Sequence, residues 1–140
     1  MKEDLEIELI LSDGYKLFQN KKYIEAIDIF NKALNINKDY FKTLYLLGIS
    51  YALVNKLNDA KKFLLKSSAI DNNNYFVFYN LAKVFSDLNN DEEAIKFHIR
   101  SIELGPKNYQ VWLNYGISLK KLKKYEEALS SFDKALKISK

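Results

Sequence analysis

The residues that could perform catalysis or hold a metal ion are few in this chain. His98 is the single histidine and there is no cysteine, so the sequence offers no cluster of nitrogen and sulfur ligands for zinc. Glu92-Glu93 and Glu126-Glu127 are paired carboxylates of the kind that acid–base catalysis uses. Adjacent helix residues point in different directions, however, and each pair opens a predicted helix, where the dipole favours acids. The sequence therefore predicts no enzyme, no metal site and no cofactor.

A lysine cluster with aromatic residues nearby is the feature that points toward nucleic acid. Lysines outnumber acidic residues in residues 105–140. The cluster and its aromatic neighbours are Lys120, Lys121, Lys123, Lys124, Tyr109, Trp112 and Tyr115. Basic patches beside aromatic rings bind single strands, because phosphates meet the ammonium groups while bases stack on the rings. A lysine-rich turn between helices is more often simply solvated, so we expect a protein partner rather than a nucleic acid.

Length and composition are those of a globular chain. The 140 residues fit one domain, and a hydrophobic fraction of 48% is enough for a continuous core. One proline and four glycines leave long stretches for helix. No run approaches the roughly 18 apolar residues of a membrane span, and the acidic start of the chain has no signal-peptide pattern. We expect a cytoplasmic protein with no membrane association.

Small residues recur along the chain at a fixed spacing of 34 residues. Three columns share it: Ala26, Ala60, Ala94 and Ala128; Gly14, Gly48, Ala82 and Gly116; Ala33, Ser67, Ser101 and Ala135. Bulky residues fill three more: Ile10, Leu44, Phe78 and Trp112; Leu17, Tyr51, Phe85 and Leu119; Phe30, Leu64, His98 and Phe132. Small residues let helix backbones approach and bulky ones fill the gaps, so the pattern predicts antiparallel helix pairs. His98 is then an interhelical packing residue.

This pattern resembles the tetratricopeptide repeat, a helix–turn–helix unit of 34 residues. The resemblance runs from about Ile7 to Lys140 and gives four repeats, approximately 7–40, 41–74, 75–108 and 109–140. It departs from the family pattern at Asp13, at His98, and at the closing proline, which is present only as Pro106. It implies an all-α, right-handed superhelical solenoid of four antiparallel helix pairs, forming a single domain over residues 1–140.

The resemblance also implies where a ligand would lie. In the resembled family the first helix of each repeat lines a concave groove, which binds a peptide segment or a helix of a partner protein. The expected contact residues are Tyr15, Lys42, Tyr45, Ile49, Phe76, Tyr79, Asn80, Lys83, Leu113, Asn114 and Ile117. Glu8, Leu11, Ser12, Leu46 and Gln110 complete the groove positions. Several of the aromatic residues would equally well pack between neighbouring first helices, and this alternative stays open.

Two variants within the resembled family give further expectations. Chaperone-tail binders carry a clamp of Lys, Asn and Arg, but Tyr45, Ile49 and Gln110 stand at three of its positions here, so the clamp is absent. Sugar-transferase repeat regions carry a ladder of asparagines, of which Asn80 and Asn114 match two. An asparagine amide both donates to and accepts from a peptide backbone. The alternative function is thus a substrate-recognition region of a larger enzyme such as a glycosyltransferase, or a self-assembling scaffold.

We expect the protein to self-associate through its last helix. The repeat pattern ends with the second helix of the fourth repeat and shows no capping helix after it. Repeat arrays expose an apolar face at an uncapped end. We expect Leu129, Leu136 and Ile138 to lie uncovered on that face, and a homodimer through the last helix to bury them.

Overall fold

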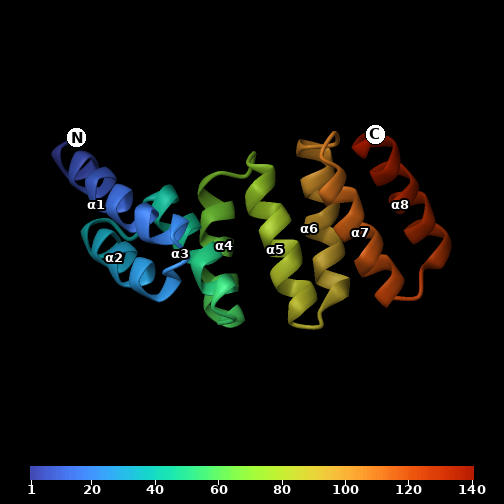
Figure 1. Ribbon diagram of the computed structural model, residues 1–140, viewed down its shortest axis with the longest axis horizontal. Helices are drawn as coiled ribbons and strands as arrows, with labels where there is room; N and C mark the ends of the chain where they lie inside the picture. Colours follow the sequence, from blue (N-terminus) through green and yellow to red (C-terminus); the bar gives the residue numbers. More distant parts are fainter. The chain divides into compact units, whose positions relative to one another are not determined.

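The computed structural model describes residues 1–140, and its regular structure is entirely α-helical (Figure 1). The helices are α1 (Lys2–Gln19), α2 (Tyr23–Ile36), α3 (Phe41–Leu53), α4 (Leu57–Ile70), α5 (Tyr75–Asp87), α6 (Asp91–Leu104), α7 (Tyr109–Lys121) and α8 (Tyr125–Ser139). Each predicted repeat contains one pair of packed helices, so the predicted all-α fold of helix pairs is confirmed. None of the helices combines the length and apolar character needed to cross a membrane.

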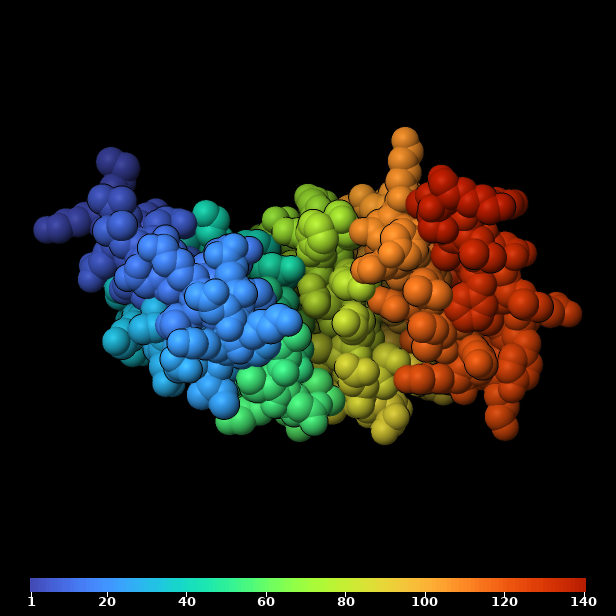
Figure 2. Space-filling model, viewed as in Figure 1, coloured from blue at the N-terminus to red at the C-terminus, as the bar shows by residue number.

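The helices are grouped into two compact units. The first unit is Met1–Asn72, with α1 to α4, and the second is Asn73–Lys140, with α5 to α8. Within each unit a helix packs mainly on its neighbours in the sequence. Side chains fill the space between neighbouring helices on the face shown in Figure 2. Each unit thus holds two repeats, and the expectation of a single domain over residues 1–140 stays a prediction.

The core of the first unit lies where α3 packs against the α1–α2 pair. Its buried members are Ile7, Leu11, Ala26, Ile27, Phe30, Ala33, Leu44, Leu47 and Phe63. Leu44 and Leu47 of α3 are fully buried, and so are Ile7 of α1 and Phe30 of α2. Burying one such side chain stabilises the fold by about 1.5–3 kcal/mol. The first helix of a repeat is therefore held by the preceding helix pair, and this fixes the face that it leaves to solvent.

The column of glycines marks the closest approach within each helix pair. A Cβ placed on these glycines would lie 2.5 Å from the Phe30 ring at Gly14, 2.6 Å from the Leu64 side chain at Gly48, and 2.5 Å from the Phe132 ring at Gly116. Such distances are too short for any real Cβ, so the predicted role of the small column is confirmed. In the third repeat the column holds Ala82, and the bulky column across from it holds His98. The imidazole is smaller than the phenyl rings of the first and fourth repeats, which suits the extra methyl group of the alanine.

The turn inside each helix pair has the same backbone geometry in all four repeats. Lys21, Asn55, Asn89 and Lys123 have φ angles of 63, 62, 61 and 63°. This is the left-handed region, which asparagine tolerates and lysine disfavours. The lysine-rich turn expected from the sequence contains the fourth of these residues, and its position between α7 and α8 is confirmed.

The helix caps differ between the two units. The cap position of α3 is Tyr40 and not the aspartate before it, so no side chain caps this helix. The backbone N–H of Asp39 instead donates to Asn37 Oδ1 at 2.9 Å, because the two residues form a local turn. Asparagines do cap three helices of the second unit: Asn74 accepts from the N–H of Phe76, Asn90 from that of Glu93, and Asn108 from that of Gln110.

Candidate functional site

A cavity of about 390 Å³ opens between α1 and α3 in the first unit. Its lining is Glu8, Leu11, Ser12, Tyr15, Lys42, Tyr45 and Leu46. All seven belong to the groove positions mapped from the sequence, so the fold brings together residues that the chain separates by about one repeat. Ile49, the remaining mapped position of α3, is half-buried and does not line this cavity. The cavity has an apolar wall with charged residues at its edge.

A charged network holds one edge of this cavity. The Tyr40 hydroxyl donates to one carboxylate oxygen of Glu8, and the Lys42 ammonium group donates to the other at 3.1 Å. The hydrogen bond from Tyr40, followed by the contacts with Lys42, lowers the pKa of Glu8 against the opposing effect of partial burial. The same hydrogen bond raises the pKa of Tyr40 to about 12. Glu8 therefore stays ionised near neutral pH, and α1 is tied to α3 on this side.

The first helices of the second unit expose a more extended surface. Phe76 of α5 and Leu113 and Ile117 of α7 are exposed, with 49%, 38% and 41% of their surface accessible to solvent. The Tyr79 hydroxyl donates to Gln110 Oε1 at 3.1 Å and so connects α5 to α7. This contact of Tyr79 agrees with the alternative in which aromatic residues pack between neighbouring first helices. The other three apolar side chains remain available to a partner.

The two asparagines of the expected ladder differ in their surroundings. Asn80 donates from Nδ2 to the backbone oxygen of Phe76 at 2.8 Å, within its own helix. Asn114 lines a small cavity between α5, α6 and α7. An amide that bonds to its own helix is less available to grip a peptide backbone, so the structure gives the ladder no added support.

This small cavity has a volume of about 170 Å³, and most of the residues that line it are of polar types. Three of the predicted contact residues reach it: Lys83, Asn114 and Ile117. The expected contact residues did not include its other members, which are Ser86, Asp87, His98, Ser118 and Lys121. The available signal was His98 itself, a polar residue that interrupts the apolar column of Phe30, Leu64 and Phe132.

His98 is 2% exposed and is hydrogen-bonded to α7. Its Nε2 lies 2.9 Å from Ser118 Oγ, while its Nδ1 has no hydrogen-bond partner. Burial lowers the pKa of His98 to about 4, although the nearby charge of Asp91 acts in the opposite direction. The Asp91 carboxylate accepts a hydrogen bond from Ser86 Oγ at 2.8 Å. The serine–histidine contact thus lacks the carboxylate that orients the imidazole in serine hydrolases.

Two of the three residues expected to be uncovered on the last helix, both leucines, are exposed, and the third, Ile138, is half-buried. Leu129 and Leu136 are 64% and 60% exposed on α8, and they lie about two helical turns apart. Ile138 is half-buried and lies on another face, because two residues turn a helix by about 200°. A second apolar cavity, of about 340 Å³, adjoins Leu136 and is lined also by Tyr109, Leu113, Phe132, Ala135 and Ser139.

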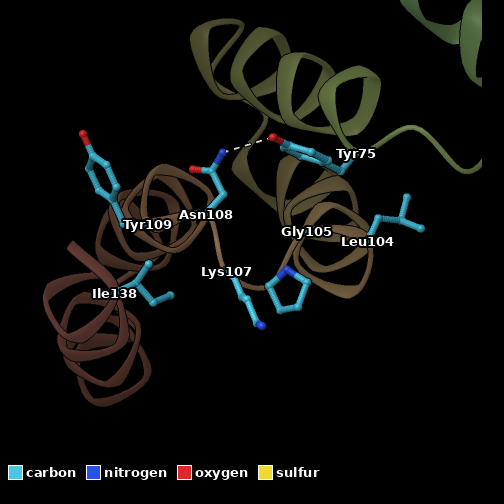
Figure 3. Close-up of a pocket in the computed structure, with 8 residues that line it drawn as sticks. Tyr75, Leu104, Gly105, Lys107, Asn108, Tyr109 and Ile138 are labelled. Atoms are coloured by element: carbon cyan, nitrogen blue, oxygen red, sulfur yellow. Dashed lines mark hydrogen bonds between the residues drawn. The ribbon is translucent and has the colours of Figure 1, made fainter. Parts of the chain in front are cut away.

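Ile138 belongs instead to an open cavity of about 720 Å³ at the turn between α6 and α7 (Figure 3). Asn108 Nδ2 donates to the Tyr75 hydroxyl at 3.3 Å across this site. The Tyr75 ring packs on Gly105, where a Cβ would lie 2.9 Å from the ring. Glycine at this position lets the turn pass close to the tyrosine, so these contacts explain the residue types without a ligand.

The comparisons with known proteins agree with this arrangement. Models of the tetratricopeptide repeat match residues 14–40, 77–108 and 109–140, which together make up well over half of the chain. Among solved structures, a double mutant of MamA RS-1 superposes with a TM-score of 0.92 at 19% identity, over 99% of this chain and 77% of that chain. MamA from residue 41 onward, of Desulfovibrio magneticus RS-1, gives a TM-score of 0.91 at 18% identity, over 95% and 75% of the two chains.

A further structure of MamA gives a TM-score of 0.90 at 20% identity, over 95% of this chain and 78% of that chain. At these identities the structural matches show the fold alone, which is the helical-repeat solenoid type. Repeats of this kind are protein-interaction or scaffold modules, and they point to a non-catalytic role. By its repeat sequences and its helix pairs, the chain belongs to the tetratricopeptide repeat family.

Proposed function

We propose that this protein is a non-catalytic adaptor that binds a peptide segment or a helix of a partner protein against its first helices. The contact surface is formed by α1 and α3 in the first unit and by α5 and α7 in the second. The observation that supports this most strongly is the cavity between α1 and α3, whose lining consists of groove positions mapped from the repeat pattern. The expected contact residues listed in the sequence analysis are the proposed site.

The cavity between α1 and α3 suits an apolar side chain of the partner. Tyr15, Tyr45 and Leu46 provide its apolar surface, and 44% of Tyr15 is exposed. Docking a leucine-sized side chain there would remove apolar surface from water on both partners, worth about 25 cal/mol per Å². The network of Glu8, Tyr40 and Lys42 fixes the cavity edge, so little side-chain order would have to be gained on binding.

A capture experiment with one substitution tests this proposal. The intact protein is immobilised, and partners captured from the source cells are quantified by mass spectrometry for the wild type and for Tyr45→Ala. The matched control is Ile99→Ala, which also removes an exposed apolar side chain, from the second helix α6. The proposal expects specific partners that Tyr45→Ala loses and Ile99→Ala keeps. Partners lost with Ile99→Ala and retained with Tyr45→Ala would place binding on the other side of the repeats.

A second candidate function, self-assembly, is favoured by the surface of α7 and α8. In the first unit the corresponding residues Ile7 and Leu11 are buried, at 0% and 4%, because α3 covers the α1–α2 pair. At the same repeat positions Tyr109 and Leu113 are 43% and 38% exposed beside the apolar cavity next to Leu136. We propose that a second copy of this chain covers that surface through Leu129 and Leu136, as a two-fold symmetric dimer.

A further inference from the structure

The exposed side chains of α8 follow the spacing of a helix-pairing surface. Tyr125, Leu129 and Leu136 are 57%, 64% and 60% exposed, and Phe132 between them is half-buried. These four residues, which we call the α8 seam, follow one another at steps of 4, 3 and 4 residues. Steps that alternate between three and four keep side chains on one stripe of a helix, where the side chains of a second helix can pack between them. The α8 seam therefore suits another helix.

A matching seam is present on α2, where a helix of this chain covers it. Its residues, at the corresponding repeat positions, are Tyr23, Ile27, Phe30 and Leu34. α3 packs on α2, and the two inner residues, Ile27 and Phe30, are only 8% and 0% exposed. Leu44 and Leu47 of α3 belong to the same core. α8, in contrast, packs mainly on α7 and lies at the edge of the second unit in Figure 1. A helix with leucines at the contact is thus the occupant that such a seam takes within this chain.

A second copy of the chain offers two helices with well-exposed leucines near its ends, α1 and α8. Leu9 of α1 is 62% exposed, but Asp13 follows it at the repeat position that Leu47 holds on α3. Leu47 is fully buried, so α1 in the place of α3 would bring the carboxylate of Asp13 into an apolar contact. Removing a carboxylate from water without a partner is strongly unfavourable. The α8 seam carries no charge, so α8 of the second copy is the better occupant.

The charges at the two ends of α8 decide the direction of the pairing. Glu126 lies in the first turn, and Lys137 and Lys140 lie at the end of the helix. All three are exposed beside the seam, within about 80° of Leu129 around the helix axis. In an antiparallel pair each Glu126 meets the lysines of the other copy, whereas a parallel pair sets like charges against each other. The antiparallel direction also places the positive N-terminal end of each helix beside the negative C-terminal end of the other.

We propose that two copies of this chain pair through α8 as antiparallel helices, seam against seam, with Glu126 of each copy beside Lys137 and Lys140 of the other. The inference rests on the self-assembly candidate and adds the direction of the pairing and its charged contacts. Because both copies use the same surface, the assembly closes at two copies and does not grow into a filament. The α8 seam shares no residue with the cavity between α1 and α3, so the dimer keeps two such cavities.

Cysteine cross-linking of the full chain tests the direction. The sequence has no cysteine, so an introduced thiol reports on its own position alone. Glu126→Cys and Lys137→Cys are prepared separately, mixed and oxidised mildly. Antiparallel helices bring these two positions together and hold identical positions about 16 Å apart along the axis, too far for a disulfide. We expect at least about tenfold more disulfide-linked dimer from the mixture than from either protein alone. The control Lys32→Cys, at an exposed site on α2, should give only background in every mixture.

Charge reversal tests the ionic contacts. Glu126→Lys should weaken the dimer about fivefold by light scattering, because the dimer contains two Glu126–lysine contacts and both become repulsive. The matched control is Glu92→Lys, which makes the same change at the same repeat position, in the first turn of α6. It should leave the dimer unchanged. Equal weakening by the two substitutions would overturn the proposed charge pairing.

The other outcomes separate this inference from the self-assembly candidate. Cross-linking of each cysteine variant with itself, at the rate of the mixture, would show a parallel pair. Loss of association in Leu9→Glu, which we expect to associate normally, would place α1 of the neighbouring copy in the contact. Either result overturns the antiparallel pair and leaves self-assembly standing. A wild type that stays monomeric at high concentration would end both, and partner binding through Tyr45 would still stand.

Discussion

At the scale of single residues, His98 shows how a polar group is accommodated in a packed helix pair. The other repeats place Phe30, Leu64 and Phe132 at its position. Its ring satisfies one nitrogen through Ser118 and leaves the other without a partner. An unpaired buried donor or acceptor costs about 1–3 kcal/mol, so this histidine weakens the packing that a phenylalanine would provide. The stability of the folded protein therefore depends on whether His98 is protonated.

We predict that His98 makes the protein less stable in mild acid. The unfolded chain binds a proton at a pKa of about 6.5, and the folded chain does so only at about 4. Stability due to this group is therefore full above pH 6.5, falls as the pH drops from 6.5 to 4, and is level below that. The total loss is about 3 kcal/mol, since one pKa unit corresponds to about 1.4 kcal/mol.

The measurement is urea unfolding of the wild type and of His98→Phe at several pH values between 7 and 4. Groups that do not interact with His98 are common to both proteins, so their contributions cancel in the difference. The wild type should lose more stability than His98→Phe across this range. Parallel losses in the two proteins would show that the histidine is not buried in its neutral form.

At the scale of the helix pair, the turns distinguish the repeats more than the helices do. The four turn residues share one left-handed geometry, but two are asparagines and two are lysines. Asparagine adopts this region more readily because its short polar side chain bonds locally. Lys21 and Lys123 thus hold a conformation that their residue type disfavours.

We predict that Lys123→Asn stabilises the protein by about 0.5–1 kcal/mol and that the reverse change, Asn89→Lys, destabilises it by a similar amount. Both residues lie in turns of the second unit, so the two variants test the same geometry in opposite directions. Thermal unfolding would measure the effect as a rise and a fall in Tm. Changes of the same sign in both variants would contradict the explanation from backbone conformation.

The sequence predicted the helix pairs well, and there is a physical reason why it did not predict every cavity. The glycine and alanine columns report close backbone approach, which depends on side-chain size alone, and the structure confirms it at Gly14, Gly48 and Gly116. The cavity around His98 depends on three helices meeting, and no single-helix pattern contains that information. Ile138 is half-buried whereas Leu136 is exposed, because successive residues of a helix are 100° apart and Ile138 shares its face with the buried Ser131.

At the scale of the whole molecule, association is the property that one substitution tests best. The surface of α8 combines two exposed leucines with an adjacent apolar cavity. A dimer interface needs about 800 Å² on each partner, and this surface is a starting patch for one of that size.

We predict a concentration-dependent increase in mass by light scattering, which Leu136→Glu abolishes by placing a charge on the apolar surface. The control is Leu65→Glu, which alters an exposed leucine on α4. It should leave the association unchanged. A wild type that stays monomeric at high concentration would exclude the proposed dimer, and so would an oligomer that persists with Leu136→Glu.

The packing of each helix on its neighbours in the sequence also has a kinetic consequence. The contacts that define a unit join residues about one or two helices apart, so the chain closes only short loops as it folds. Proteins dominated by such local contacts have low relative contact order and fold in microseconds to milliseconds. A helix pair can form before the rest of the chain has left the ribosome, and each new helix then finds a partner already in place.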